Sequence, residues 1–215
     1  MKKICFIIIM VCSAFFNACN ITTLYPIFTE KDIVFSQQLL GTWKFNNSQK
    51  DSDLTEIERV SSTVLNELSN SLQKIGGKGY LITKRDPRQN VITRHLAFLV
   101  KIGKYQYLDY YPLETAEEKK YNDFFKVHYI RMHRFYRIIL KTDQSFELKQ
   151  FDQDFIQRLI DTRQISLRHE LQPYLSSGEY IITASTEELQ AYIAKYADDP
   201  YVYTKESSSY YIKLH

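Results

Sequence analysis

The chain of 215 residues contains little glycine and little proline, and these shortages exclude several classes of protein. Six glycines and five prolines are too few for a collagen-like or low-complexity chain. A hydrophobic content of 44% with 25% charged residues also excludes disorder over most of the chain. Gly76-Gly77-Lys78-Gly79 lacks the Ser or Thr that completes a phosphate-binding loop, so we interpret it as a turn. The length suits one domain.

An excess of charge of one sign is also missing. The formal net charge is +3, and it falls to +1 without Lys2 and Lys3, because 26 basic residues then stand against 25 acidic ones. A surface with nearly equal numbers of positive and negative charges does not indicate the excess of basic residues that is typical of nucleic-acid-binding proteins. We therefore expect no nucleic-acid partner.

Cysteine is confined to the start of the chain, and the residues around it have the pattern of an export signal. Lys2-Lys3 precede an apolar run over residues 4–16, which is too short to span a bilayer as a helix but has the length of a signal-peptide core. The run leads into Phe16-Asn17-Ala18-Cys19, which resembles the lipobox of bacterial lipoproteins with Phe in place of the usual Leu. Two alternatives are a secretory signal cut near Ala18, with a free thiol, and an uncleaved anchor. The three cysteines are Cys5, Cys12 and Cys19.

The mature chain of such a lipoprotein would hold one cysteine, Cys19, whose thiol carries the lipid. Each buried lipid CH₂ contributes about 0.8 kcal/mol, so two or three acyl chains such as palmitate attach a protein lastingly to a membrane. We expect a cell-envelope protein on the outer membrane that faces the periplasm, because residues 20–23 lack the acidic run that resembles a surface-export signal. The expected layout is a signal peptide (1–18), a lipidated cysteine with an ordered tether (19–38) and one domain (39–215).

Aromatic residues are abundant, with 17 Tyr and 13 Phe against one Trp. Such residues fit half-buried strand surfaces, so the composition favours β-structure. The segments come mostly as adjacent hairpins without β-α-β alternation. We predict a mainly β fold (α+β): an antiparallel, lipocalin-like curled sheet or barrel of about eight strands, with about three helices packed on it. The strand-like segments are 39–45, 80–84, 91–101, 105–111, 125–140, 146–151, 180–183, 201–204 and 210–214.

Three segments have apolar residues at helical spacing. The longest covers residues 53–75, where Asp53 and Glu56 resemble a capping box and Gly76-Gly77 supplies the stop. The second predicted helix covers residues 152–160, with Asp152 as its N-cap. The third lies between a capping box that starts at Ser185 and the run Asp198-Asp199-Pro200.

Gly41-Thr42-Trp43 on the first predicted strand resembles the Gly-X-Trp signature that opens lipocalin-type barrels. In those barrels the Trp packs under one end. A wider pattern over residues 24–190 is similar to an uncharacterised family of Bacteroidota lipoproteins, and this resemblance implies a location and a barrel-like fold but no reaction. Relative to a plain lipocalin pattern, the helix expected over residues 53–75 is an insertion. The runs that carry the wider resemblance are 24–26, 40–43, 108–112, 133–138 and 183–190.

Motifs for catalysis, metal binding or a cofactor are missing from the sequence. There is no His-Glu-X-X-His, and the mature chain has no pair of cysteines. His128 and His133 are five residues apart, which places them on opposite faces of a continuous strand. No Ser has a Gly-X-Ser-X-Gly context, and capping or solvation explains the paired carboxylates. We therefore predict no metal, no cofactor and no catalytic residue.

The best polar cluster lies on the central predicted strands. Strand parity groups Asp109 with Tyr107 on one face, His133 with Arg137 on one face of the next strand, and His95 on the face opposite to its apolar neighbours. If all these faces point into a barrel, the five side chains converge on an aromatic small-ligand site. The alternative, which we prefer, is an Asp–His or Asp–Arg pair that satisfies a polar core position.

Three functions remain open from the sequence. The one we expect is a lipid-anchored binding or structural module without catalysis, whose partner is a small molecule or an envelope protein. The second is an envelope hydrolase or isomerase that uses His133 with Asp109 or Arg137. The third is an accessory subunit of an envelope complex, which would carry a contiguous exposed apolar patch.

Overall fold

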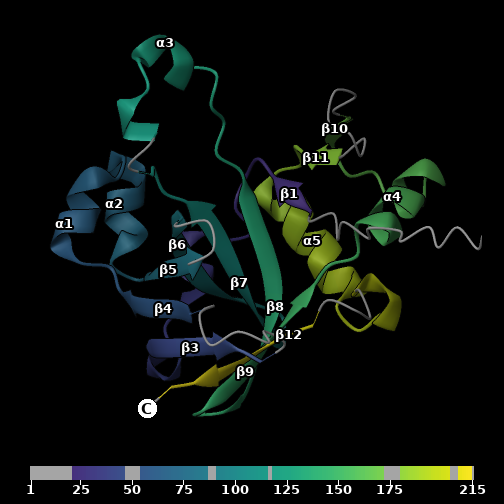
Figure 1. Ribbon diagram of the computed structural model, residues 1–215. Coiled ribbons are helices and arrows are strands. Elements are labelled where there is room, and N and C mark those ends of the chain that lie inside the picture. Colours follow the sequence, from purple (N-terminus) through teal and green to yellow (C-terminus); the bar gives the residue numbers. More distant parts are fainter. Residues whose placement is uncertain are drawn as a thin grey trace, which may run out of the picture.

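A computed structural model describes residues 21–46, 54–86, 91–115, 118–171, 180–203 and 208–214. Within them, eight antiparallel strands close into a barrel, which confirms the predicted mainly β, lipocalin-like fold (Figure 1). Seven strands follow one another in chain order, and the strand near the C-terminus closes the ring between the seventh and the first. The barrel consists of β3 (Gly41–Phe45), β4 (Leu54–Arg59), β5 (Tyr80–Asp86), β6 (Val91–Ile102), β7 (Tyr105–Pro112), β8 (His133–Thr142), β9 (Ser145–Gln150) and β12 (Ser209–Lys213).

Four short strands lie outside this ring. β1 (Thr22–Thr23) pairs with the first residues of β8 and also with β11 (Tyr180–Ile182), which pairs in turn with β10 (His169–Leu171). β2 (Ile33–Val34) pairs with β6. The N-terminal segment (residues 21–34) is therefore paired with the barrel from its first described residues.

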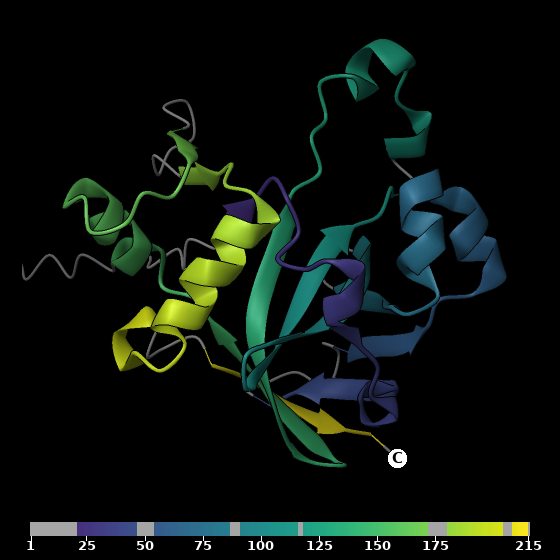
Figure 2. The same ribbon diagram turned by 180° about the vertical axis from the view of Figure 1, so that it is seen from behind.

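The described chain has five α-helices instead of about three, and all of them lie outside the barrel (Figures 1 and 2). α4 and α5 pack with the N-terminal segment on the outer face of β6 to β8, and this apolar cluster is called the outer core below. Each helix of the described chain is too short or too polar to cross a membrane. The helices are α1 (Ser62–Glu67), α2 (Asn70–Gly76), α3 (Asp123–Lys126), α4 (Gln153–Asp161) and α5 (Thr186–Tyr196).

The inside of the barrel holds a second apolar cluster, called the barrel core below. Trp43 is 1% exposed, donates from Nε1 to the carbonyl of Leu39 at 2.8 Å, and meets the Phe146 ring edge-on at 4.6 Å. Phe146 in turn stacks on Tyr211 at 4.7 Å. Leu39 belongs to η2 (Gln37–Leu39) and is completely buried. These side chains fill one end of the barrel, as the lipocalin resemblance implies for the Trp.

The helix predicted over residues 53–75 is wrong in its first third. Residues 54–59 form β4, in which Thr55 and Ile57 face the barrel core, and only then do α1 and α2 follow. Leu54 and Ile57 are three residues apart, which suits a helix, but the barrel needs a strand between β3 and β5 to close. The predicted capping-box residue Asp53 lies outside the described residues. α2 does end at Gly76, as expected.

Two other predicted strands are wrong in part: one begins later than expected, and the other is replaced by a 3-10 helix in its described residues. In the segment 125–140, the first residues belong to α3 and an extended link, and β8 begins only at His133. His128 therefore lies outside any strand, so the parity argument against a shared metal site with His133 does not apply to it. In the segment 201–204, η4 (Pro200–Val202) replaces the strand, and Tyr203 makes an isolated bridge to Phe151.

Candidate ligand site at the mouth of the barrel

The structure divides the five residues of the predicted cluster between the two faces of the sheet. Tyr107, Asp109, His133 and Arg137 lie on the outer face of β7 and β8, together with the outer core. His95 lies on the inner face and lines a cavity in the barrel. The assumption that all five side chains face the barrel interior is therefore wrong for four of them, and the five do not converge.

Asp109 and His133 do meet, as a buried pair on the outer face. Asp109 is fully buried, and its Oδ1 lies 2.6 Å from His133 Nδ1. Its other oxygen, Oδ2, accepts a hydrogen bond of 3.0 Å from the backbone N–H of Ile27. One carboxylate thus fastens β8 and the N-terminal segment to β7. This is the polar core pair that the sequence left open as the alternative to a ligand site.

Arg137 and Tyr107 are direct neighbours across β7 and β8 on the same outer face. Arg137 Nη1 donates to the carbonyl of Ala197 at 3.0 Å, and its guanidinium lies 3.6 Å from the centroid of the Tyr105 ring. Tyr107 is completely buried, and burial raises the pKa of its hydroxyl. These contacts attach the C-terminal end of α5 to the barrel.

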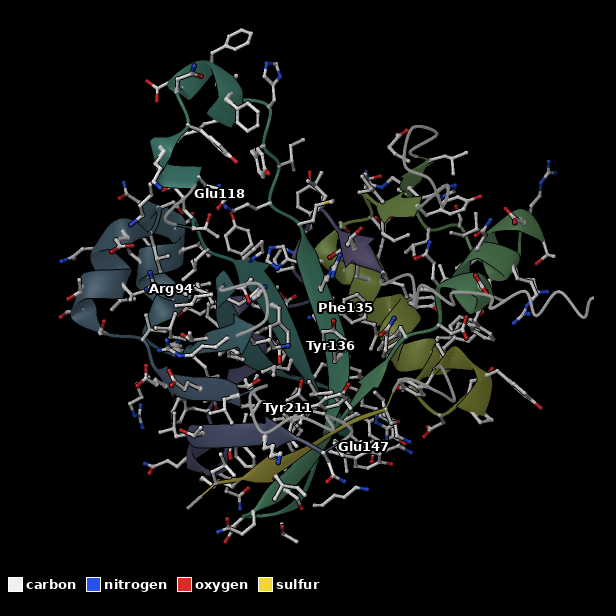
Figure 3. The ribbon with its side chains drawn as sticks, viewed as in Figure 1. Arg94, Glu118, Phe135, Tyr136, Glu147 and Tyr211 are labelled. Atoms are coloured by element: carbon white, nitrogen blue, oxygen red, sulfur yellow. The ribbon has the colours of Figure 1, made fainter. Side chains whose placement is uncertain are left out.

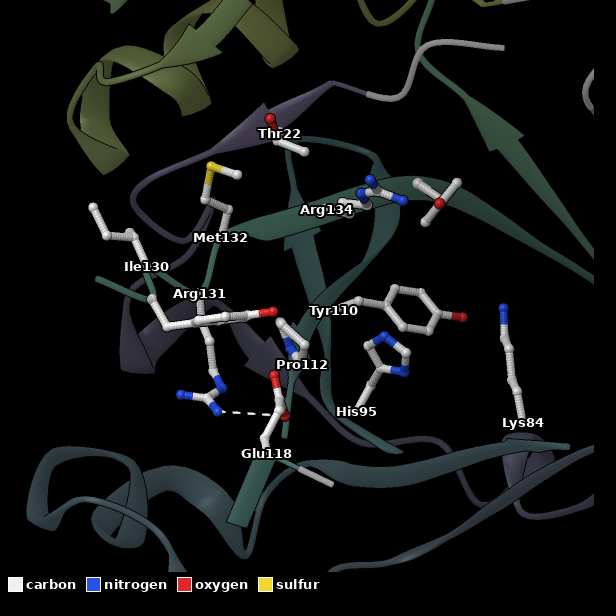
Figure 4. A pocket seen from close by; sticks show the side chains of 12 residues that line it. Thr22, Lys84, His95, Tyr110, Pro112, Glu118, Ile130, Arg131, Met132 and Arg134 are labelled. Atoms are coloured by element: carbon white, nitrogen blue, oxygen red, sulfur yellow. Dashed lines mark ion pairs between the residues drawn. The ribbon is translucent and has the colours of Figure 1, made fainter. Parts of the chain in front are cut away.

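A cavity of about 450 Å³ lies at the mouth of the barrel, between the inner faces of β5 to β8 and the segment that joins β7 to β8 (Figure 4). This volume is within the range of small-ligand sites. The opposite end of the barrel is filled by the barrel core, so the cavity is closed at its floor. Its polar lining includes Lys84, His95, Tyr110, Arg131, Arg134 and Tyr136.

Positive charge is in excess in this cavity. Glu118 is the one carboxylate among its described lining residues, and it pairs with Arg131 at 3.6 Å (Figure 4). Lys84 and Arg134 have no ion-pair partner within the described part of the chain. Burial, together with the positive charge of Arg134, lowers the pKa of the Lys84 amine. The two cations therefore destabilise each other where they stand.

Tyrosine rings flank these cations without neutralising them. Lys84 Nζ lies 5.6 Å from the centroid of the Tyr110 ring, and Tyr110 meets Tyr136 edge-on at 5.5 Å. Burial raises the pKa of both hydroxyls, that of Tyr110 strongly. Both phenols are therefore neutral at pH 7, where they provide apolar contact and hydrogen-bond donors but no negative charge.

His95 adds a polar atom with an unmet hydrogen bond. Its Nδ1 is buried and has no hydrogen-bond partner among the residues that the structure describes, while the ring meets Tyr110 edge-on at 5.7 Å. Burial, with the positive charges of Lys84 and Arg134, lowers the pKa of His95 to about 4. The ring is therefore neutral at pH 7 and offers one donor and one acceptor. An anion placed in the cavity would offset the charges that hold this pKa down.

Sequence reasoning found one of these residues, His95, and missed Lys84, Tyr110, Arg134 and Tyr136. Strand parity does separate the two faces of β8 correctly, because Phe135 lies in the outer core whereas its neighbour Tyr136 lies on the barrel side (Figure 3). What parity cannot give is which of the two groups faces inward. Leu96 to Val100 are all completely buried, so the central strand shows no polar face that would mark the outside.

Comparisons with protein-family models, with curated proteins and with solved structures give no match for this chain. The chemistry of the cavity is therefore inferred from its side chains. Two unpaired cations, a neutral imidazole and two phenols can hold a small anion. The described lining contains no Ser or Cys that could serve as a nucleophile.

Proposed function

We propose that this protein is a lipid-anchored, non-catalytic module of the bacterial cell envelope that binds a compact organic anion at the mouth of its barrel. The observation that carries this proposal is the pair of cations Lys84 and Arg134, which face one cavity without a described counter-charge. Taking cations out of water is costly unless an opposite charge compensates them. A bound carboxylate, sulfonate or phosphate would supply that compensation and accept hydrogen bonds from both side chains.

The size of the cavity restricts the anion to a compact molecule. Trp43, Phe146 and Tyr211 fill the barrel below it, and each is less than a tenth exposed. The barrel below the cavity therefore has no space for a long acyl chain. The rings of Tyr110 and Tyr136 at the cavity wall favour an anion with an apolar or aromatic body.

The anchor in this proposal is supported by the sequence. Cys19 lies outside the described residues, and it is the last residue of the lipobox-like tetrapeptide that ends a signal-like run. Two residues later the chain is already packed on the barrel, since Ile21 is 6% exposed and Thr22 pairs with β8. A lipid on Cys19 would hold the folded body directly at the membrane, which we propose is the outer membrane on its periplasmic side.

The alternative of a hydrolase or isomerase has less support from the geometry. Both oxygens of Asp109 are used in structural hydrogen bonds, and Asp109 and His133 are both less than a tenth exposed. Arg137 is engaged with Ala197 and Tyr105. A general acid or base has to reach a substrate, and neither the pair nor Arg137 lines the cavity at the mouth.

Anion binding is tested with benzoate, benzamide and benzamidine, which have nearly the same shape and carry negative, zero and positive charge. We expect calorimetric titration to show binding of benzoate, weaker binding of benzamide and none of benzamidine. Lys84→Met and Arg134→Gln should each weaken benzoate binding by about 10- to 100-fold, because a hydrogen bond to a charged group is worth about 1.5–3 kcal/mol. Both variants should leave benzamide binding unchanged.

Lys101→Met is the matched control for this experiment. Lys101 lies on β6, six residues from His95 and so with the same strand parity, but it is exposed at the opposite end of the barrel. Its removal changes the net charge as Lys84→Met does and should leave benzoate affinity unaltered. The proposal is contradicted if the protein binds benzoate and benzamidine with equal affinity. It is also contradicted if neither Lys84→Met nor Arg134→Gln weakens benzoate binding.

A further inference from the structure

The residues between β7 and β8 form an arm that stands away from the barrel (Figures 1 and 2). The arm comprises residues 118–132 and contains η3 (Glu118–Lys120) and α3. In the described chain, none of its residues belongs to the outer core or the barrel core. Whatever stabilises its conformation must therefore come from the arm itself, from its ion pairs, or from something that it contacts.

The arm exposes large apolar side chains, three of them far more than the others. Phe124, Val127 and Ile130 are 77%, 74% and 68% exposed. Phe124 and Val127 are three residues apart, on one side of the helical turns that run from Asn122 to Tyr129, and Ile130 follows directly after these turns. These three residues are called the exposed row below. Contiguous exposed apolar surface marks a place where a protein meets a membrane or a partner. Three further exposed rings of the arm contact one another in a tilted arrangement, at centroid distances of 4.4 and 5.6 Å: Tyr121, Phe125 and Tyr129.

We propose that the arm is the part of the protein that contacts the bilayer, with the exposed row inserted among the lipid headgroups. This inference rests on the lipid anchor of the proposed function. Cys19 precedes Ile21 by two residues, and two residues of extended chain reach at most about 7 Å. Ile21 is packed on the barrel, so the bilayer must come close to this part of the fold.

The anchor and the arm belong to the same end of the barrel. β1, which begins one residue after Ile21, pairs with His133 and Arg134. These are the first two residues of β8, and the arm ends directly before them. An anchored molecule therefore has its arm and the mouth of its cavity on the membrane-facing side, whereas the end closed by Trp43 faces away.

The chemistry of the arm suits a bilayer better than a protein partner. A stable protein interface buries about 800 Å² on each side with complementary shape, and the three side chains of the exposed row offer far less. Aromatic residues are enriched at the membrane–water interface, where no complementary shape is needed. Charge contributes little, because three of the four Lys and Arg side chains of the arm are paired: Lys119 with Glu67, Lys126 with Glu114, and Arg131 with Glu118.

The position of the arm also bears on the cavity. Tyr129, Ile130 and Arg131 line the cavity from the arm side. A bilayer contact that fixes the arm would thus fix one wall of the anion site and open the cavity beside the lipid headgroups. The ligand would then enter from the layer of solution at the membrane surface.

The test places an indole at the tip of the arm in the full-length, lipidated protein. The Phe124→Trp variant is reconstituted into vesicles of phosphatidylcholine that carry bromine at known depths, because bromine quenches indole emission on contact. The natural Trp43 is buried in the barrel core and gives the same background in every sample. We expect the added indole to lose most of its emission to bromines about 5–10 Å below the headgroup surface, and equally so when anionic lipid is added.

Tyr201→Trp is the matched control, because Tyr201 is also an exposed aromatic residue, at 66%, but it belongs to η4, which follows α5, whereas the arm lies between β7 and β8. Its indole should be quenched by iodide in solution and not by bromolipid. If the Phe124→Trp indole is quenched only by iodide, the arm lies in water and the proposal is overturned. If neither reagent quenches it, a second copy of the chain covers the arm, which also overturns it.

Failure of this inference is distinguishable from failure of the proposed function. Flotation of the vesicles in a density gradient reports the lipid anchor separately, because an unanchored chain stays at the bottom. If the protein floats with the vesicles while its arm indole stays in water, the lipid anchor is present and the arm does not contact the bilayer. Binding of benzoate, measured in detergent solution, reports the cavity independently of both.

Discussion

Asp109→Ala is expected to destabilise the folded protein by about 3–5 kcal/mol, because it breaks a fully buried pair and leaves His133 without its partner. The backbone N–H of Ile27 loses its acceptor as well, so the N-terminal segment loses its attachment to β7. Single domains are stable by only about 5–15 kcal/mol, so a large share of the total is removed. Urea unfolding followed by Trp43 fluorescence measures the change.

Asp109→Asn is the control that separates structure from chemistry. The amide keeps the size of the carboxylate, can accept from the Ile27 N–H and can donate to His133 Nδ1, so we expect a loss of only about 1–2 kcal/mol. Neither variant should change the benzoate affinity of the folded fraction, because Asp109 lies outside the cavity. An Asp109→Ala protein with the urea midpoint of the natural chain would show that the pair is not a structural element.

Cys19→Ser is expected to abolish lipid attachment, which is an all-or-none effect because the lipid is carried by one sulfur atom. Two or three acyl chains each contribute about 0.8 kcal/mol per buried CH₂, so loss of the lipid removes the attachment that these chains supply. The variant should fail to incorporate an alkyne-labelled palmitate supplied to growing cells, and its intact mass should show that residues 1–18 are retained.

Cys12→Ser is the control, since it removes a thiol from the predicted signal peptide and should leave both the labelling and the mass of the mature protein unchanged. The expectation fails if the Cys19→Ser protein is processed at the same rate as the natural chain and still sediments wholly with the envelopes. The expected result is based on the sequence alone, because Cys19 and the residues before it lie outside the described residues.

The fold was predictable because most of its strands are continuous, aromatic-rich and joined by short turns. The segments 91–101 and 105–111 were expected as adjacent strands, and they form the hairpin of β6 and β7, in which Gly103 of the turn has a φ of +59°, which glycine adopts without strain. β4 was missed because Leu54 and Ile57 have helical spacing, and only pairing with β3 and β5 makes this segment a strand. That pairing depends on residues distant in sequence, so no local pattern reports it.

The arm was missed for a different reason. Residues 125–132 are rich in aromatic and β-branched side chains, a composition that is typical of a strand. In a strand these side chains would be buried, whereas Val127 and Ile130 are among the most exposed apolar residues of the described chain. Sequence patterns identify apolar residues but do not distinguish burial in a core from contact with a membrane.

The candidate site was predictable only in part. Parity correctly brought Asp109 and His133 together and placed His95 on the other face from its apolar neighbours. The direction of each face was not predictable, because the outer face of β6 to β8 is covered by α4, α5 and the N-terminal segment and is as apolar as the inner one. Lys84 and Arg134 were therefore not among the predicted site residues.

The His95 ring reports most directly whether the cavity binds an anion. Its resonance is identified by loss in a His95→Gln variant, and its pKa is measured by NMR with and without benzenesulfonate, which stays ionised at low pH. The pKa should be about 4 in the free protein, because burial and the charges of Lys84 and Arg134 favour the neutral ring. A bound anion should raise the pKa toward 6.5, and by linkage its affinity should rise as the pH falls through this range. An identical titration with and without benzenesulfonate would contradict an anion site at the mouth of the barrel.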